Sequence, residues 1–227
     1  MDIYYLILVL PAFLFALYAQ FMMKSTYNKY SKISNLKGLT GADVARQILQ
    51  SYGLQNITVE RVAGSLTDHF DPNSNVIRLS STVYESNSVA AIGVAAHETG
   101  HALQHNKGYA PIKLRNRLVP VAGIGSAIGP YMAIFGLIFN WPLLAELGII
   151  LFTVAVAFYL ITLPVEFNAS KRAISILESN GILASQELGP TRKVLNAAAM
   201  TYVASAAVAM ANLLRLVFIY SGIKDND

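Results

Sequence analysis

Four apolar stretches, each about twenty residues long, constrain the fold of this chain more than any other feature of its sequence. They cover residues 3–23, 118–139, 143–163 and 195–220. A helix needs about 20 apolar residues to cross the hydrocarbon core of a bilayer. The first stretch lacks the basic start of a signal peptide, so we interpret it as a retained anchor. We therefore predict a mainly α membrane protein with about four transmembrane helices.

The composition agrees with lipid as part of the solvent. Hydrophobic residues make up 54% of the chain and charged residues 13%, whereas a soluble domain carries about a quarter charged residues. Cysteine is absent, which excludes disulfides and thiolate metal sites. The net charge is +4, but the basic residues are not gathered into runs that contain aromatic residues. We interpret them as membrane-orienting charges and expect no nucleic-acid partner.

The polar segments between the stretches predict the orientation. Eleven Lys and Arg residues lie between residues 24 and 117, and four lie between residues 164 and 194. Because basic residues stay on the cytoplasmic side, we expect both segments in the cytoplasm, within a multi-pass protein of the cell membrane that contacts the lipid bilayer. The predicted segments are an N-terminal anchor (1–23), a cytoplasmic segment (24–117), a transmembrane hairpin (118–163), a second cytoplasmic segment (164–194), a last span (195–220) and a tail (221–227).

The longer polar segment is expected to fold as a small α+β portion. Thr40 and Asp43 have the spacing of a helix-capping pair, and apolar residues then recur at helical intervals. Residues 57–62 alternate as a strand does, and further strands are expected around residues 65–70 and 75–80. We predict a small antiparallel sheet beside a helix.

Residues 88–106 form the most informative predicted helix. Its sequence, SVAAIGVAAHETGHALQHN, places His97 and His101 four positions apart, with Glu98 next to the first. Residues four apart share one face of a helix, so the two imidazoles can bind one zinc ion through Zn–N bonds of about 2.0–2.1 Å. Glu98 can then take a proton from water and pass it to a leaving amine. The HExxH pattern predicts Zn²⁺ as the cofactor, His97 and His101 as metal ligands, and Glu98 as the general base.

The other histidines and the carboxylates leave alternatives open. Burying two imidazoles and a carboxylate without a metal would be costly; satisfied core histidines are the alternative to a metal site. His105 lies one further turn along and is a ligand, a hydrogen-bond partner of a ligand, or polar material at the helix end. A catalytic zinc also needs a third protein ligand and an open position for water. The carboxylates on the same side of the membrane include Asp68, Asp71, Glu85, Glu166, Glu178 and Glu187. Glu166 directly follows the third apolar stretch, where it is either an interfacial residue or a site residue.

Four separated motifs carry a resemblance to a known family. They are AAHETGHALQ at residues 95–104, EFNASKRA at 166–173, LTDHFDP at 66–72 and NAAAMTYVA at 196–204. Together they resemble the YugP-like family of bacterial neutral zinc metallopeptidases. More distantly, the chain is similar to the HtpX and CAAX-prenyl-protease type of membrane peptidase. The motifs occur in order over nearly the whole chain, from the first anchor to the last span.

The resemblance implies a gluzincin-like site, in which Glu166 is the third zinc ligand on a helix after the third stretch. In related glutamate-ligand peptidases an acid two or four residues later often orients a zinc histidine. Here Asn168 and Ser170 occupy those positions, and an amide or a hydroxyl can accept the same hydrogen bond more weakly than a carboxylate.

The resemblance also suggests how substrate and oxyanion are held. The strand at residues 75–80 would bind substrate as an added strand at a sheet edge; an ordinary structural strand is the alternative. A donor to the oxyanion is also needed. Tyr202 is the first candidate for this catalytic role, followed by Arg172 and His69, with plain packing as the alternative for each.

Three functions follow from these features. The first is a zinc-dependent endopeptidase at the cytoplasmic membrane surface that cleaves peptide or protein substrates near the membrane, for example in membrane-protein quality control. The second, an intramembrane protease, is disfavoured because the apolar run before His97 has only about eight residues, against roughly 20 for a span. The third is a non-catalytic membrane scaffold or adaptor with a structural zinc site. It is disfavoured by Glu98, and a fourth ligand such as His105 or Asp68 would favour it. The oligomeric state stays open.

Overall fold

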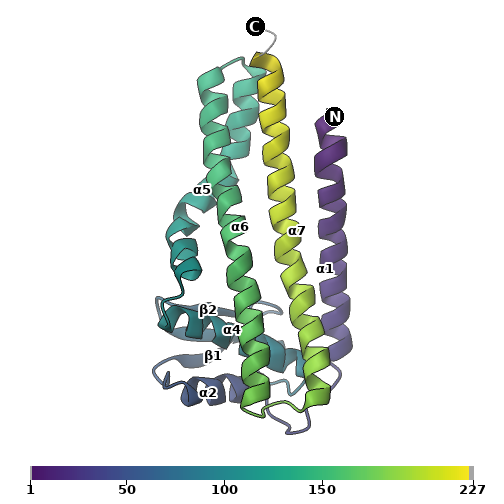
Figure 1. The fold of residues 1–227 in the computed structure, drawn as a ribbon, viewed down its shortest axis with the longest axis vertical. Coiled ribbons are helices and arrows are strands. Elements are labelled where there is room, and N and C mark those ends of the chain that lie inside the picture. The colour runs from purple at the N-terminus through teal and green to yellow at the C-terminus, as the bar shows by residue number, and fades with distance from the viewer. Residues whose placement is uncertain (1, 225–227) are drawn as a thin grey trace. The chain divides into compact units, whose positions relative to one another are not determined.

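The computed structural model describes residues 2–224, so Met1 and residues 225–227 of the expected tail lie outside the described residues. The chain is mainly helical with one small sheet (Figure 1), as predicted. In chain order the elements are the π-helix η1 (Tyr5–Val9), α1 (Leu10–Tyr30), α2 (Gly41–Ser51), β1 (Thr58–Val62), β2 (His69–Asp71), β3 (Val76–Ser80), α3 (Ser81–Tyr84), α4 (Val89–Asn106), α5 (Ala110–Ile138), α6 (Pro142–Ser179) and α7 (Ser185–Lys224).

Two compact units make up the described chain. One, here called the membrane unit, comprises residues 2–20, 110–164 and 200–224; the other, here called the α/β unit, comprises residues 21–109 and 165–199. Helices α1, α6 and α7 each contribute residues to both units.

The membrane unit has the surface and packing expected in lipid. Within residues 2–224, four helices are long and apolar enough to cross a membrane, which confirms the predicted number. Large apolar side chains point outward, with Tyr131 64% and Ile150 59% exposed. Helices α5 and α6 approach backbone to backbone, because a Cβ added at Gly129 would lie 2.9 Å from the nitrogen of Phe152. Small residues allow such close contact between helices in lipid.

An ion pair in the membrane unit joins two residues that lie far apart in the sequence. The guanidinium of Arg215 on α7 donates to both carboxylate oxygens of Asp2, with an Nη2–Oδ2 distance of 2.7 Å and an Nε–Oδ1 distance of 3.2 Å. Arg215 thus has a charged partner although it lies in an apolar helix, as polar residues in membrane helices require.

The helices are longer than the apolar stretches that predict them. Helix α1 continues to Tyr30, α6 continues to Ser179, and α7 begins at Ser185. Hydropathy marks only the apolar part of a helix, whereas the backbone hydrogen-bond ladder continues through polar residues until a stop signal. The polar extensions of these three helices belong to the α/β unit.

The sheet of the α/β unit is mixed, so the prediction of an antiparallel sheet was wrong. Its order is β1-β3-β2, with β1 parallel to β3 and β2 antiparallel to β3. Strand β3 is central and buried on both faces, with Ile77 and Leu79 fully buried on one face and Val76 and Ser80 buried on the other. The flanking strands are partly exposed. A near-continuous apolar strand of this kind belongs between two others.

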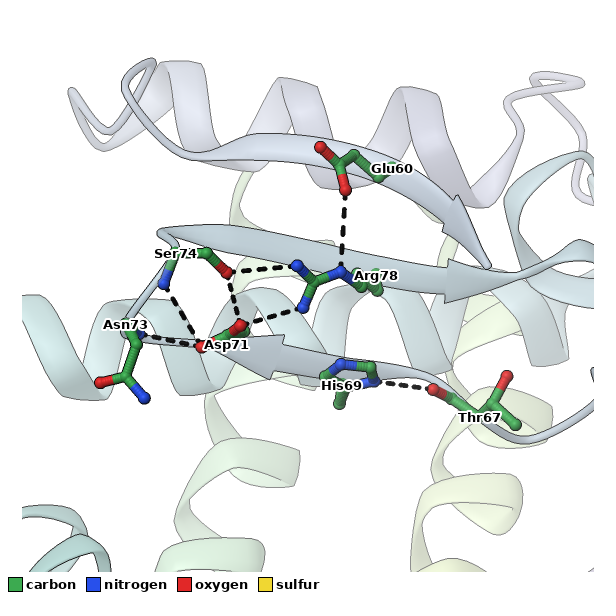
Figure 2. Close-up of polar contacts among 7 residues, drawn as sticks. All are labelled: Glu60, Thr67, His69, Asp71, Asn73, Ser74 and Arg78. Atoms are coloured by element: carbon green, nitrogen blue, oxygen red, sulfur yellow. Dashed lines mark hydrogen bonds and ion pairs between the residues drawn. The ribbon is translucent and has the colours of Figure 1, made fainter. Parts of the chain in front are cut away.

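Strand β2 is also shorter than predicted, and the hairpin that joins it to β3 is fixed by Asp71 (Figure 2). The carboxylate of Asp71 accepts the backbone N–H of Asn73 at 2.9 Å and the guanidinium of Arg78 at 3.0 Å. The Nε of Arg78 also lies 3.7 Å from a carboxylate oxygen of Glu60 on the neighbouring strand β1, and the two side chains form an ion pair. These contacts fix β3 between its neighbours. It therefore has no free edge, and the suggested role of residues 75–80 as a substrate-binding edge strand was wrong.

A continuous core holds the sheet and the helices of the α/β unit together. Thr40 caps α2 and exchanges hydrogen bonds with Asp43, as the sequence predicted. Helix α2 packs on α4, and α4 contacts both β2 and β3. The most buried side chains of this core include Ile48, Ile77, Leu79, Ile92, Leu103 and Leu177. Helix α4 is thus packed at the centre of the unit.

Candidate metal centre

Helix α4 is a buried helix that begins and ends at clear signals. The Ser88 hydroxyl accepts the backbone N–H of Ala91 at 3.2 Å, which caps the N-terminus. The eight residues between Ser88 and His97 are apolar or glycine, and seven of them are buried. The helix ends at Asn106, and Gly108 follows with a φ of +65°, a conformation that favours glycine. This frame places residues 97–101 in the middle of a rigid helix.

Three side chains from two helices converge in the α/β unit. His97 and His101 come from α4 and Glu166 comes from α6, and their ligand atoms lie within 4.8 Å of one another. The Nε2 atoms of the two histidines are 3.1 Å apart. The Oε2 atom of Glu166 lies 3.2 Å from His97 Nε2 and 3.5 Å from His101 Nε2.

These separations match a tetrahedral metal site. Ligand atoms bonded to zinc at about 2.0–2.1 Å lie about 3.3–3.4 Å apart at the tetrahedral angle. Two imidazole nitrogens and one carboxylate oxygen are also ligand types that zinc binds in catalytic sites, with one position left for water. The three residues thus fit a zinc ion in both distance and chemistry.

The site is enclosed, and its charges are coupled. The side chains of His97, His101 and Glu166 are 11%, 10% and 3% exposed. Burial by itself lowers the pKa of His101, but its hydrogen bond with Glu166 and the nearby charge of Glu98 raise the pKa above its ordinary value of 6.5. Without a cation, these carboxylates therefore draw a proton onto His101, and a metal ion would compete with that proton.

The second nitrogen of each histidine has a hydrogen-bond partner that fixes its ring. His97 Nδ1 lies 3.1 Å from the Ser170 hydroxyl, to which it donates when the ring binds a metal through Nε2, and His101 Nδ1 donates to Gln104 Oε1 at 3.0 Å. With the Nδ1 protons held this way, both Nε2 lone pairs are free for a metal. Ser170 thus occupies the orienting position that the resemblance suggested.

Gln104 is a site residue that the sequence reasoning missed. It is fully buried, and its Nε2 donates to the backbone oxygen of Val165 at 2.8 Å and to Asn168 Oδ1 at 3.0 Å. Asn168 in turn accepts the Arg172 Nε–H at 2.7 Å. Asn168 therefore acts on the histidine pair through Gln104 rather than directly. The sequence signal was present, because a buried amide three residues after His101 lies on the same helix face.

Glu98 is buried beside the three converging residues. It is 9% exposed, and its charge contributes to the raised pKa of His101. It also acts on Asp68, whose pKa is raised mainly by burial and further by Glu98. Asp68 does not join the ligand group; its carboxylate accepts the Ser80 backbone N–H at 2.7 Å. A carboxylate thus lies next to the candidate metal position, as a general base requires, and its catalytic role stays a prediction.

The remaining candidates are placed as follows. His105 is exposed, packs its ring against Phe70 with centroids 5.9 Å apart, and is not part of the converging group. Because side chains alternate along a strand, His69 lies on the face of β2 opposite Phe70, and its Nδ1 donates to the Thr67 oxygen at 2.9 Å (Figure 2). Tyr202 lies on α7 in the membrane unit and is 37% exposed. Its role as an oxyanion donor stays a prediction.

A helical protein with four candidate membrane spans and a buried His-His-Glu group has the features of a membrane metallopeptidase. Comparison with known proteins identifies the family: residues 5–221 match the family model described as "Putative neutral zinc metallopeptidase", and the chain belongs to that family. It is 46% identical over 223 residues to a protein of Bacillus subtilis (strain 168) described as "Putative membrane protease YugP", a match that covers 98% of this chain and 99% of that protein. No solved structure matches the chain.

Proposed function

We propose that this protein is a zinc-dependent endopeptidase whose active site faces the cytoplasm at the membrane surface. The observation that carries the proposal is the convergence of His97, His101 and Glu166 at distances that suit one zinc ion, with Glu98 buried beside them. The family membership supports the same chemistry. The site would hold Zn²⁺ through the two Nε2 atoms and one oxygen of Glu166.

Different residues of the protein would carry out the proton transfers and orient the metal ligands during peptide hydrolysis. A bound zinc ion supplies a Lewis acid that lowers the pKa of water to about 7 and polarises the substrate carbonyl. Glu98 takes the proton from the attacking water and returns it to the leaving amine. Ser170 and Gln104 keep the histidine rings in the ligating orientation through their Nδ1 hydrogen bonds. The burial of all these groups excludes bulk water and strengthens their electrostatic interactions.

The substrate is proposed to be an extended polypeptide near the membrane. Strand β2 is an outer strand of the sheet and contacts α4 through Phe70 and His105. An extended chain can pair with such an edge through its backbone, which accepts many sequences. In the sequence, only about a dozen residues separate His105 from the second apolar stretch. Damaged membrane proteins or their cytoplasmic tails are therefore the proposed substrates, and faster cleavage of a membrane-tethered peptide than of the same free peptide tests this.

A structural zinc site is the main competing function, and the ligand group argues against it. Structural zinc is bound by four protein ligands. Within residues 2–224 the group contains three, and the two candidates for a fourth are engaged elsewhere: Asp68 accepts hydrogen bonds from Ser80, and His105 packs on Phe70. A position left for water and a buried Glu98 suit catalysis.

Replacing Glu98 tests the proposed catalysis. Glu98→Gln keeps the shape of the side chain and removes the base, so zinc content should stay unchanged while peptide cleavage falls by about 10²–10⁴-fold. Glu85→Gln is the matched control, because Glu85 is an exposed acid of the same unit that pairs with the exposed Arg61. Full activity in the Glu98 variant, or equal losses in both variants, would contradict the assignment.

Single cysteines test the proposed orientation, since the chain contains none of its own. Gln55 is exposed in the α/β unit, and Trp141 is 57% exposed at the turn between α5 and α6. A membrane-impermeant maleimide should label Trp141→Cys in intact cells and Gln55→Cys only after permeabilisation. The reverse pattern would place the metal centre on the outer side.

A further inference from the structure

A cavity of about 330 Å³ lies between α6 and α7 within the α/β unit. Its walls include Phe167, Ser170, Lys171 and Ile174 from α6, and Arg192 and Leu195 from α7. The metallopeptidase chemistry proposed above does not use this cavity. It adjoins the candidate metal centre through Ser170, which is a wall residue and whose hydroxyl lies 3.1 Å from His97 Nδ1.

The cavity combines apolar walls with two basic side chains, Lys171 and Arg192. Within the described part of the chain, neither Lys171 nor Arg192 forms an ion pair or a hydrogen bond with another side chain. Glu178 also lines the cavity, seven residues beyond Lys171, which is roughly 10 Å along the helix. Two basic side chains and one acidic side chain thus line the cavity, and this balance favours an anion as the ligand. Near Ser170, Lys171 has no acidic residue on its own turn of α6.

The position of these residues in the chain indicates which anion binds. The α6 wall begins at Phe167, four residues after the apolar stretch 143–163, and the α7 wall ends inside the apolar stretch 195–220. Basic pockets next to the cytoplasmic ends of membrane helices bind the head groups of anionic lipids. Phe167, Ile174 and Leu195 give the cavity the apolar walls that the glycerol and upper acyl carbons of a lipid require, whereas a free phosphate ion gains nothing from them.

We propose that the α6–α7 cavity binds the phosphate head group of an anionic membrane lipid, with Lys171 and Arg192 pairing with the phosphate. Ser170 connects this lipid to the metal centre. When its oxygen accepts the His97 N–H, its own O–H remains free to donate to a phosphate oxygen. A bound phosphate thus keeps the Ser170 oxygen turned toward His97, which supports the ligating orientation of that ring. This coupling rests on the proposed zinc site, whereas the lipid site itself does not.

Lipid binding to the full-length, zinc-loaded protein tests the site directly. Titration with phosphatidylglycerol and with phosphatidylcholine of the same acyl chains, followed by native mass spectrometry, gives both affinities. Each basic residue is expected to contribute about fivefold, so Lys171→Gln/Arg192→Gln should bind phosphatidylglycerol roughly thirtyfold more weakly. Lys193→Gln is the matched control, since Lys193 is exposed on α7 next to Arg192 but does not line the cavity. An unchanged melting temperature of the double variant checks its folding.

The outcomes separate the lipid site from its alternatives. Equal phosphatidylglycerol affinity in the double variant and the unaltered protein overturns the site, and so does binding of inorganic phosphate as tight as that of the lipid. A second measurement compares zinc affinity in nanodiscs of the two lipids. Zinc should bind more tightly in phosphatidylglycerol, and the double variant should lose this difference; equal zinc affinities overturn the coupling through Ser170. A protein that binds lipid in this pattern but cleaves no peptide would contradict the proposed protease function and leave the lipid site standing.

Discussion

Gly100 sets the distance between the two helices that hold the candidate metal ligands. A Cβ added at this position would lie 2.9 Å from the backbone oxygen of Ala169 and 3.4 Å from its Cα. Both atoms belong to the backbone of α6, which cannot rotate away as a side chain can. To restore an ordinary contact of about 3.4 Å, α6 must move by about 0.5 Å relative to α4. Glu166 and Ser170 lie on the same helix and would move with it.

Gly100→Ala is therefore expected to weaken zinc binding more than it weakens the fold. Metal–ligand distances tolerate a variation of only about 0.2 Å. A shift of α6 that relieves the clash would therefore lengthen the bonds between the metal and its ligands beyond this range. Overpacking costs about 1–3 kcal/mol, which corresponds to a zinc affinity lower by about 5- to 150-fold. In the metal-free protein the helices can separate slightly, and the helix propensity of alanine, about 1 kcal/mol better than glycine, offsets part of the strain.

Competition with a chromogenic chelator measures zinc affinity, and thermal unfolding of the metal-free protein measures stability. Gly123→Ala is the first control: Gly123 lies inside α5, where no atom of another described element comes within 4 Å of its added Cβ, so the variant gains helix propensity without a new contact. Gly93→Ala is the second, because its Cβ would meet the Thr191 side chain at 2.8 Å, on the side of α4 that packs against α7. It should reduce stability and spare the metal. Zinc affinity in Gly100→Ala equal to that of the unaltered protein would refute the reasoning.

Further predictions follow from the hydrogen bonds of the metal centre and from the ion pair of the membrane unit. Gln104→Leu keeps the buried volume and removes the acceptor of the His101 N–H, so zinc affinity should fall about 10- to 100-fold in the chelator assay; a smaller change than for an exposed control such as Gln55→Leu would contradict this role. Because the pKa of His101 is raised above 6.5, zinc affinity should fall by about tenfold per pH unit below that raised value, and zinc titrations from pH 5 to 8 measure it. In the metal-free protein, protonated His101 stabilises the fold below pH 6.5, and this contribution is lost as the pH rises through the raised pKa. Arg215→Ala removes the partner of Asp2 and should lower the unfolding free energy by about 1–3 kcal/mol, with Arg215→Lys, which keeps the charge without the bidentate contact, lying in between in thermal unfolding.

The sequence predicted the elements that local chemistry determines. Apolar stretches of sufficient length identified the four candidate spans, and the capping pair at Thr40 and Asp43 identified the start of α2. The spacing of His97 and His101 placed two imidazoles on one helix face. Each of these follows from a pattern within a few turns of chain, so no knowledge of the tertiary fold was needed.

The remaining features depend on contacts between distant segments. The sheet order could not follow from strand patterns alone, because β1 pairs with β3 rather than with β2, its neighbour in the sequence. The position of Glu166 next to the histidines came from the family resemblance, since several carboxylates were available on the same side. Gln104 carries no charge, so a pattern of metal ligands and general bases does not mark it, whereas its neutral amide joins His101 to the backbone of α6.

A simple arrangement emerges from these contacts: two helices cross, and each supplies a pair of residues four positions apart. Helix α4 supplies His97 and His101, and α6 supplies Glu166 and Ser170, so that each pair lies on one helix face. The crossing point is the contact between Gly100 and Ala169, which lie inside the respective pairs. Because the ligands and the Ser170 hydroxyl belong to one helix pair, the α4–α6 packing alone sets the coordination geometry. The sheet packs against α4, and in the proposed function it receives the substrate, so substitutions at the edge of β2 should change substrate selection and leave zinc affinity unchanged.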